Sequence, residues 1–183
     1  MSRVVVAWGR FNPPTIGHEK LIEAVARLAK RDDYFIYPSH TQKKPKDPLP
    51  SDRKVEYMKL MFPKHADHII YDKDINTIIK LLQKYQGTYE DLTLIAGSDR
   101  VPEYERLITR YNGVEYSYRN LDVVSAGERD PDADGASGMS ASKMREAAKD
   151  LKTTEFKSGI PDTLTVGQKL ELMKEVRIGM GLK

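Results

Sequence analysis

Ten residues near the start of the chain, Gly9 to His18, constrain its fold more than any other stretch. They read Gly-Arg-Phe-Asn-Pro-Pro-Thr-Ile-Gly-His and join two segments of different periodicity. Residues 4–8 form a continuous apolar run that begins with three valines, which predicts a buried strand. Residues 17–31 carry apolar side chains at helical spacing, which predicts an amphipathic helix. The ten residues between them are therefore predicted to form a strand-to-helix turn.

This turn has the properties of an anion site. The start of a helix offers free backbone N–H groups and the positive end of the helix dipole, and both favour a phosphate. His18 lies in the first helical turn, and Gly17 lets the backbone approach a ligand closely. The alternative is a simple turn in which His18 only caps the helix. We favour the phosphate site, because the strand, turn and helix occur in the order that such a site requires.

Composition excludes several classes of protein. A chain of 183 residues can form one domain with a substantial core. Its net charge of +3 is not the strongly basic profile of a nucleic-acid-binding protein. The absence of cysteine excludes disulfides, zinc–thiolate sites and thiol nucleophiles. No apolar run reaches membrane-spanning length and no cleavage signal is visible, so we expect a cytoplasmic protein that binds neither nucleic acid nor membrane.

Predicted strands and helices alternate along the rest of the chain. Strands are expected at 34–37, 69–71, 92–96 and within 114–124, and helices at 17–31, 52–62, 74–82 and 100–111. This alternation predicts an α/β fold, a Rossmann-like open parallel sheet of about five strands flanked by helices. Ligands of such sheets lie outside the carboxyl ends of the strands, which is where the Gly9–His18 turn is expected. We predict this domain over residues 1–151, with a C-terminal helical extension over 152–183 packed on it.

Two groups of residues could suggest a metal site. Asp130, Asp132 and Asp134 alternate as in a calcium loop, but no glutamate closes the loop and a proline interrupts it. We therefore interpret residues 128–134 as a surface loop. His65 and His68 are three residues apart, but they lack an obvious third ligand, so we interpret them as surface residues. The sequence thus predicts no protein-held metal.

A second chemical element follows the acidic loop, in Met139-Ser-Ala-Ser-Lys-Met-Arg145. Ser140 can cap a helix, and the apolar residues that follow give that helix one buried face. Hydroxyl groups, free N–H groups and the cations Lys143 and Arg145 would then meet at one helix start. This combination suits the outer phosphates of a nucleoside triphosphate. The alternative is a capped surface helix that carries an arginine.

Together, the two elements resemble the signatures of the HxGH nucleotidylyltransferases, a superfamily that includes nicotinamide-nucleotide and phosphopantetheine adenylyltransferases and the cytidylyltransferases. Thr15 stands where most members carry the first histidine, although a TxGH form occurs in the superfamily. The second signature, written ISSTxxR, is matched in register by Met139, Ser140, Ser142, Met144 and Arg145, while Ala141 departs from it. The serine-containing segment is also similar to the KMSKS loop of class I aminoacyl-tRNA synthetases, but Gly138 replaces its leading lysine.

The resemblance implies a set of site residues. Gly97-Ser98-Asp99 is similar to the GxD element beside the nucleotide in many adenylyltransferases, although a glycine turn is a plain alternative. Lys43, Lys44 and Lys46 lie where these enzymes keep a lysine for the acceptor's phosphate, and we choose Lys46. The implied catalytic residues are His18, Thr15, Arg145 and Lys46. The implied nucleotide-binding residues are Gly9, Arg10, Phe11, Asn12, Gly17, Gly97, Asp99, Ser140 and Ser142.

The activity implied by the resemblance is transfer of a nucleoside monophosphate to a phosphate-bearing acceptor, with release of pyrophosphate. ATP and nicotinamide or nicotinate mononucleotide are the expected substrates, with Mg²⁺ bound through the substrate phosphates. A CTP-dependent cytidylyltransferase is the first alternative, and a non-catalytic nucleotide-binding or assembly module is the second. The sequence leaves a homo-oligomer open.

Overall fold

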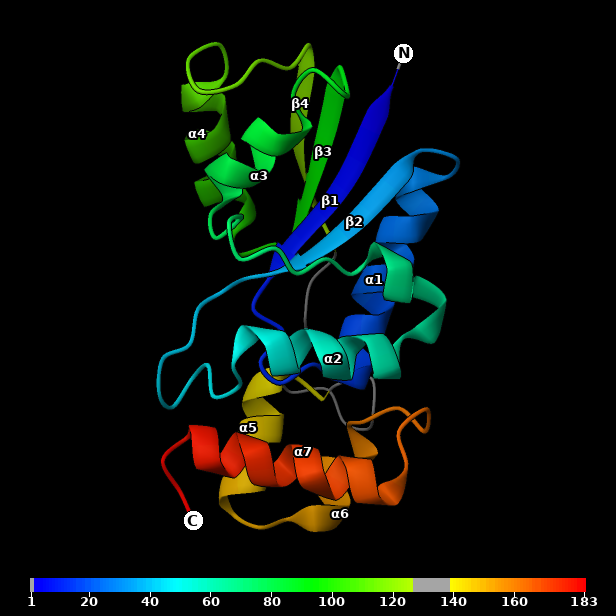
Figure 1. Cartoon of the computed structure of the whole chain (residues 1–183), viewed down its shortest axis with the longest axis vertical. Coiled ribbons are helices and arrows are strands. Elements are labelled where there is room, and N and C mark those ends of the chain that lie inside the picture. Colours follow the sequence, from blue (N-terminus) through cyan, green and yellow to red (C-terminus); the bar gives the residue numbers. More distant parts are fainter. Residues whose placement is uncertain (1, 127–138) are drawn as a thin grey trace.

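The computed structural model describes residues 2–126 and 139–183, and its centre is a parallel four-stranded sheet (Figure 1). The strands are β1 (Arg3–Gly9), β2 (Asp33–Pro38), β3 (Asp91–Ala96) and β4 (Asn120–Ser125). Their order across the sheet is β2-β1-β3-β4, so β1 is an inner strand. All four strands are parallel, so their carboxyl ends form one edge of the sheet, and the end of β1 lies near the middle of that edge. The predicted surface loop at 128–134, with the calcium loop weighed there, lies outside the described residues.

Helices cover both faces of the sheet and extend beyond its carboxyl edge (Figure 1). No helix in residues 2–126 or 139–183 is long and apolar enough to cross a membrane. The described helices are α1 (Ile16–Ala29), α2 (Ser51–Met61), the short 3-10 helix η1 (Pro63–His68), α3 (Ile78–Tyr85), α4 (Val101–Tyr111), α5 (Ala141–Lys149), α6 (Thr153–Ser158) and α7 (Val166–Gly179).

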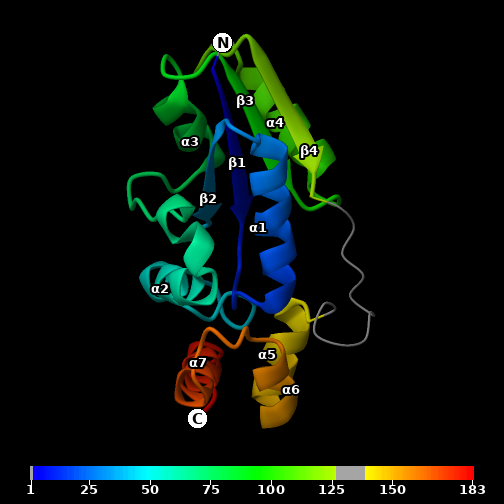
Figure 2. The same cartoon turned by 90° about the vertical axis from the view of Figure 1, so that its right-hand side faces the viewer.

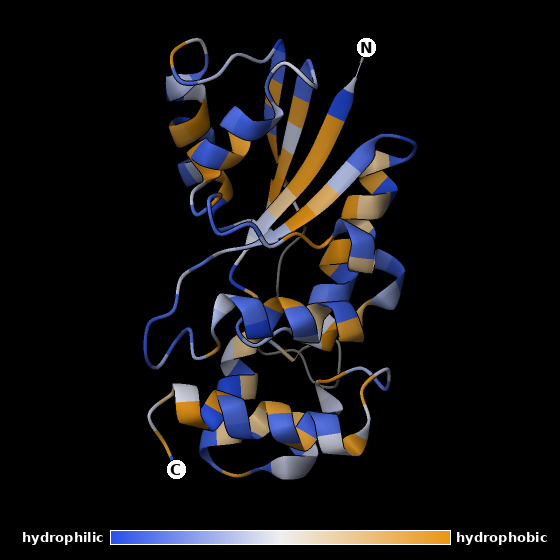
Figure 3. Ribbon diagram, viewed as in Figure 1, coloured by the Kyte–Doolittle hydropathy of each residue, from blue (hydrophilic) through white to orange (hydrophobic). Residues whose placement is uncertain are grey.

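The alternation of side chains along β1 divides the interior into two cores. Val4 and Val6 face one side, where they pack with apolar residues of α3 and α4. Val5 and Ala7 face the other side, where they join a core built from α1, α2, α5, α6 and α7. Figure 2 shows α1 and α3 on opposite sides of the sheet, and Figure 3 shows the apolar colouring of the strands between them. Both faces of β1 are buried, which is why its sequence is continuously apolar.

The predicted α/β class and parallel sheet are confirmed, but the part of the chain that the structure describes forms four strands rather than about five. Residues 69–71 were expected to form the third strand. Only Ile69 pairs, in an isolated bridge to Ile36, and the Ile70 N–H donates to the Ile36 carbonyl at 2.9 Å. The chain then leaves the sheet through a turn, in which the Asp72 carboxylate accepts from the Asp74 N–H at 2.9 Å. Three apolar residues before an aspartate-rich turn are too few to extend a sheet edge.

Two local interpretations are also wrong. The helix expected at 74–82 begins only at Ile78, because Thr77 provides the cap through a hydrogen bond from the Lys80 N–H at 3.2 Å. His65, interpreted as a surface residue, is only 6% exposed. Its ring lies between the Tyr34 hydroxyl (2.8 Å) and the Glu23 carboxylate (3.0 Å), so a polar cluster stabilises the packing of η1.

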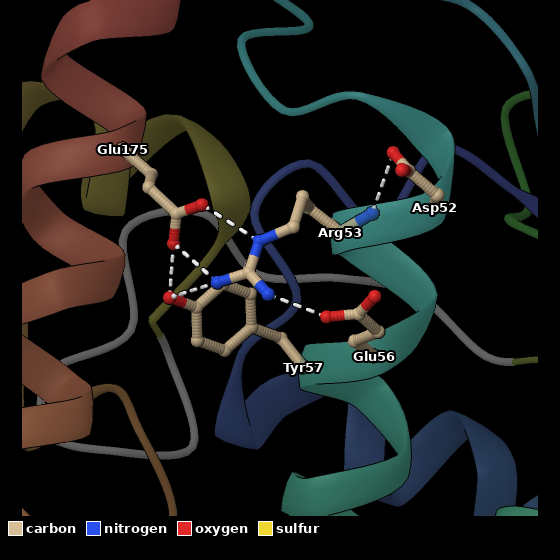
Figure 4. A network of polar contacts seen from close by, with 5 residues as sticks. All are labelled: Asp52, Arg53, Glu56, Tyr57 and Glu175. Atoms are coloured by element: carbon tan, nitrogen blue, oxygen red, sulfur yellow. Dashed lines mark hydrogen bonds and ion pairs between the residues drawn. The ribbon is translucent and has the colours of Figure 1, made fainter.

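The C-terminal helix α7 is joined to α2 by a polar network (Figure 4). The Arg53 guanidinium donates to both carboxylate oxygens of Glu175, from Nε at 2.8 Å and from Nη2 at 3.0 Å. The Tyr57 hydroxyl donates to the same carboxylate, and Arg53 also pairs with Glu56. Burial opposes ionisation of Glu175, but the hydrogen bonds from Arg53 and Tyr57 outweigh it and hold its pKa below the ordinary value of 4.5.

The lowered pKa of Glu175 predicts a pH-dependent contribution to stability. The ionised carboxylate stabilises the fold above its unfolded-state pKa, and this contribution is lost as the pH falls through the lower folded-state value. Glu175→Gln should therefore reduce the free energy of unfolding by about 1 kcal/mol at pH 7, with a smaller difference in strong acid. Urea unfolding at pH 7 and pH 3 measures both values. Glu171→Gln, at an exposed position of the same helix, is the control, and an equal effect of both changes would contradict the prediction.

Candidate functional site

A cavity of about 890 Å³ lies at the carboxyl end of the sheet. It is lined by the end of β1, the turn before α1, the segments after β2 and β3, and the start of α5. The predicted site residues that line it are Gly9, Arg10, Phe11, Asn12, His18, Lys46, Gly97, Asp99, Ser140, Ser142 and Arg145. The fold thus brings residues from distant parts of the chain to one cavity. Thr15 and Gly17 are the predicted site residues that do not line it.

Thr15 instead fixes the orientation of His18. The Thr15 N–H donates to His18 Nδ1 at 2.9 Å, and the Thr15 hydroxyl accepts from the Gly17 N–H at 3.1 Å. The first of these bonds, together with a bond from the His18 N–H to the Thr15 side chain, forms a capping box at the start of α1, and the Gly17 N–H adds a further cap bond. Because Nδ1 accepts a hydrogen bond, the ring proton is assigned to Nε2. His18 is 4% exposed and lines the cavity, so it presents a fixed tautomer to a ligand there.

Phe11 and Gly9 form a tightly packed part of the same turn. The buried Phe11 has a φ of 49°, a left-handed conformation that is unusual for an aromatic residue. Its ring lies edge-on to the His18 ring, with 4.9 Å between centroids. A Cβ atom at position 9 would lie 3.0 Å from the Phe11 ring, so only glycine fits there without displacing the ring. The Phe11 ring, held in this turn, therefore packs against the His18 imidazole.

Asn12 connects three segments of the site. Its buried side chain makes two hydrogen bonds to the backbone of Leu49, donating to the carbonyl at 3.1 Å and accepting from the N–H at 2.9 Å. Its own carbonyl accepts a hydrogen bond from Arg145 Nη1 at 2.9 Å. We call the Asn12–Leu49 pair the amide clamp. It holds the segment after β2 against the first signature, and Arg145 joins α5 to both.

Ser140 caps the start of α5, as predicted, whereas Lys143 is not among the residues that line the cavity. The Ser140 hydroxyl caps the helix by accepting from the Lys143 N–H at 3.1 Å, and Ser140 and Ser142 both line the cavity. Arg145 lies one turn further and is half-buried. Burial lowers the pKa of its guanidinium, Asp47 opposes this shift, and Arg10 adds to it. A half-buried arginine beside a capped helix start is suited to bind phosphate oxygens.

Sequence analysis missed a charged group beneath the cavity. Lys54 of α2 is 0% exposed, and its ammonium donates to the Ser39 carbonyl at 2.7 Å. Asp47 is 2% exposed and its Oδ2 lies 4.0 Å from Arg10 Nη1. Within residues 2–126 and 139–183, its Oδ1 and the Ser39 hydroxyl have no hydrogen-bond partner. Burial lowers the pKa of Lys54 to about 8, although Asp47 opposes the shift. Arg10, Asp47, Lys54 and Arg145 thus form one charge cluster at the site.

A signal for Lys54 was present in the sequence. It precedes Met58 by four residues and Met61 by seven, so it lies on the apolar face of α2. A lysine at such a position must either extend to solvent or find an internal partner. The other missed residues form a wall of the cavity from α3, α4 and β1, and include Trp8, Thr77, Ile79, Tyr104 and Leu107. They belong to no signature, so only the fold reveals them.

Comparison with known proteins gives consistent matches. The family model described as cytidylyltransferase-like matches residues 6–157. A probable nicotinate-nucleotide adenylyltransferase of Acholeplasma laidlawii is 25% identical over 173 residues, which are 88% of this chain and 88% of that protein.

Solved structures of low sequence identity share the fold. A Plasmodium falciparum nicotinic acid mononucleotide adenylyltransferase complexed with NaAD has a TM-score of 0.63 at 14% identity, covering 95% of this chain and 98% of that one. A bifunctional NMN adenylyltransferase/ADP ribose pyrophosphatase from Francisella tularensis also has a TM-score of 0.63, at 13% identity. The match covers 99% of this chain and 53% of that chain, so this chain spans about half its length.

The buried Lys54 predicts a dependence of stability on alkaline pH. Between about pH 8 and the ordinary lysine value of 10.5, the unfolded chain binds a proton at Lys54 that the folded chain has lost. The contribution of Lys54 to the unfolding free energy therefore rises with pH across this window. Lys54→Met should lack this rise. The unfolding free energy of the unmodified protein minus that of the variant, measured at pH 7.5, 9 and 10, should therefore increase with pH. Lys59→Met, at an exposed position of α2, should give a flat difference, and parallel curves for Lys54→Met would refute the assignment.

Proposed function

Because the chain belongs to the cytidylyltransferase-like family, we propose that it transfers the adenylyl group of ATP to nicotinate or nicotinamide mononucleotide. The predicted membership of the nucleotidylyltransferase superfamily is confirmed by the family match over residues 6–157. The choice of ATP and of a mononucleotide is supported by the Acholeplasma laidlawii relative, whose name specifies nicotinate-nucleotide adenylyl transfer. The products are a dinucleotide and pyrophosphate.

The observation that carries this proposal is the convergence of both signatures on one cavity. His18 comes from the start of α1, and Ser140, Ser142 and Arg145 come from the start of α5. Two helix starts therefore face the same space, and each favours negative charge. A ligand with several linked phosphates matches this arrangement better than a ligand with one anionic group.

The proposed reaction is an in-line displacement at the α-phosphorus of ATP. A phosphate monoester has a second pKa of about 6, so the acceptor is mostly ionised at neutral pH and needs no general base. One of its oxygens forms a bond to the α-phosphorus while the bond to the β-phosphate oxygen breaks. The bonding electrons leave with pyrophosphate. Catalysis then depends on alignment and on stabilisation of the charge that develops on the phosphoryl oxygens.

The chain supplies donors for each part of this reaction. His18 carries its proton on Nε2 and donates to an α-phosphate oxygen, with the Thr15 N–H holding the opposite side of the ring. Ser140, Ser142 and Arg145 bind the β- and γ-phosphates of the leaving group. Lys46, which lines the cavity from the segment after β2, binds the acceptor's phosphate.

Magnesium remains part of the proposal as an ion bound through the substrate phosphates. Among the described residues, no group of three or more His, Asp or Glu side chains could hold a metal ion. Such a group is not required, because Mg²⁺ keeps several water ligands and binds mainly through phosphate oxygens. Asp99, which lines the cavity, keeps its proposed role beside the nucleotide. When bound, the ion would neutralise part of the charge on the triphosphate.

A matched pair of substrates tests the proposed activity. ATP with nicotinate or nicotinamide mononucleotide should yield a dinucleotide and pyrophosphate, whereas CTP with glycerol 3-phosphate should yield neither. His18→Ala should lower the rate by about two to three orders of magnitude, because it removes a donor to the developing charge. Pyrophosphate release and chromatography of the products measure both. Product from CTP alone would establish the cytidylyltransferase alternative, and ATP binding without turnover of any acceptor would establish a non-catalytic module.

Two further variants test the roles of Arg145 and Lys46. Arg145→Lys keeps the charge but loses the planar pair of donors, so it should raise the KM for ATP about tenfold or more. Lys46→Ala should raise the KM of the acceptor and leave that of ATP within a factor of about two, since an exposed cation contributes mainly to its own phosphate contact. Titration of both substrates against both variants gives four values. A raised KM for the acceptor in Arg145→Lys, with an unchanged KM for ATP, would show that Arg145 binds the acceptor's phosphate rather than the phosphates of ATP.

A further inference from the structure

The end of α7 lies in direct backbone contact with the segment that forms the amide clamp. A Cβ atom built on Gly179 would lie 2.0 Å from the Pro48 carbonyl oxygen, 2.6 Å from its carbon and 2.8 Å from its Cα. No side chain fits at such distances, and the obstacle is backbone rather than a side chain that could rotate away. Any residue other than glycine at position 179 must therefore displace Pro48 or the end of the helix.

Pro48 stands between two residues of the site. Leu49, on one side, makes the amide clamp with Asn12. Asp47, on the other side, is buried within 4.0 Å of Arg10. A displacement of Pro48 would consequently move both the clamp and the carboxylate of the charge cluster. A shift of α7 would thus move the two residues next to Pro48, Asp47 and Leu49, both of which lie against the first signature.

The C-terminal segment also contacts the two helices that carry the signatures. Arg177 of α7 donates to the Ala148 and Lys149 carbonyls at the end of α5, at 2.7 Å and 2.9 Å. The Gly159 carbonyl, after α6, accepts from the N–H of Ile16 at the start of α1 at 2.8 Å. The segment 152–183 therefore contacts α1, α5 and residues 47–49, all three of which position groups around the cavity.

We propose that α7 is a positioning element of the active site, and that Gly179 sets how closely residues 47–49 approach the first signature. The role goes beyond fold stability, because α7 is connected to groups around the cavity through the Pro48 backbone and the amide clamp, and also through the contacts of Arg177 with α5. The proposal rests on the proposed function only for its kinetic readout. A ligand-independent readout is therefore needed beside it.

The Gly179→Ala variant tests this role, with Gly167→Ala as the matched control. Both positions lie in α7, but among the described residues a Cβ at Gly167 would meet only Thr165 Oγ1, at an ordinary contact distance of 3.8 Å. Gly179→Ala should accelerate hydrogen–deuterium exchange in the peptide that contains Leu49, whose N–H donates to Asn12. The exchange rates of residues 91–96 of β3 should not change. In kinetics at a temperature where both variants are folded, kcat/KM should fall roughly ten- to a hundredfold for Gly179→Ala. Gly167→Ala should match the unmodified protein in both measurements.

The outcomes separate a positioning role from a structural one. Unchanged exchange at Leu49 in a folded Gly179→Ala variant, or a uniform acceleration that includes β3, would overturn the proposal. If Gly179→Ala does not fold, Arg177→Gln perturbs the same end of α7 by removing its contacts with α5, and should give the same selective exchange at Leu49. Faster exchange that is confined to α5 and α7 in Arg177→Gln would also overturn the proposal. If the unmodified protein turns over no acceptor, the proposed function fails while the exchange measurement still tests this inference.

Discussion

The amide clamp between Asn12 and Leu49 is the interaction on which the site depends most. A buried amide that both donates to and accepts from one backbone residue fixes two segments in a single register. The Asn12 carbonyl also accepts from Arg145, so the first signature, the segment after β2 and α5 meet at one residue. Asn12, which was expected to contact the nucleotide, lines the cavity and also has its side chain engaged within the protein.

Much of the fold was predictable because its determinants are local. The continuous apolar run of β1 reflects burial on both faces, and the capped, amphipathic helices follow from their own residues. The expected strand at 69–71 failed because a strand needs a partner over several residues, and here only Ile69 finds one. The signatures identified the floor of the cavity for the same local reason. The wall formed by Trp8, Tyr104 and Leu107 depends on which helices the fold brings together, and no short pattern encodes that.

Lys54 and Asp47 show a second limit of sequence reasoning. Asp47 looks like an ordinary surface charge within a polar segment, and only the spacing of Lys54 to Met58 and Met61 indicated that this lysine is buried. Both residues are buried beside the cavity. Burial of a charge is costly unless an opposite charge or a hydrogen bond compensates it, and here the Ser39 carbonyl and Asp47 share that role. The result is a positive interior beneath a site that we propose for anionic substrates. Such a field acts without direct contact and raises the local concentration of phosphates.

The capping box at the start of α1 has a consequence for sequence variation within the superfamily. The tautomer of His18 is set by the main-chain N–H of residue 15, not by its side chain. The side chain needs only to cap the helix by accepting from the Gly17 N–H, a task that any short hydroxyl or comparable acceptor performs. The residue at position 15 can therefore change while the imidazole that faces the cavity keeps its proton on Nε2, provided that the new side chain still accepts from the Gly17 N–H. Substitution of the side chain at position 15 is thus tolerated because the hydrogen bond that fixes the His18 tautomer comes from the main chain.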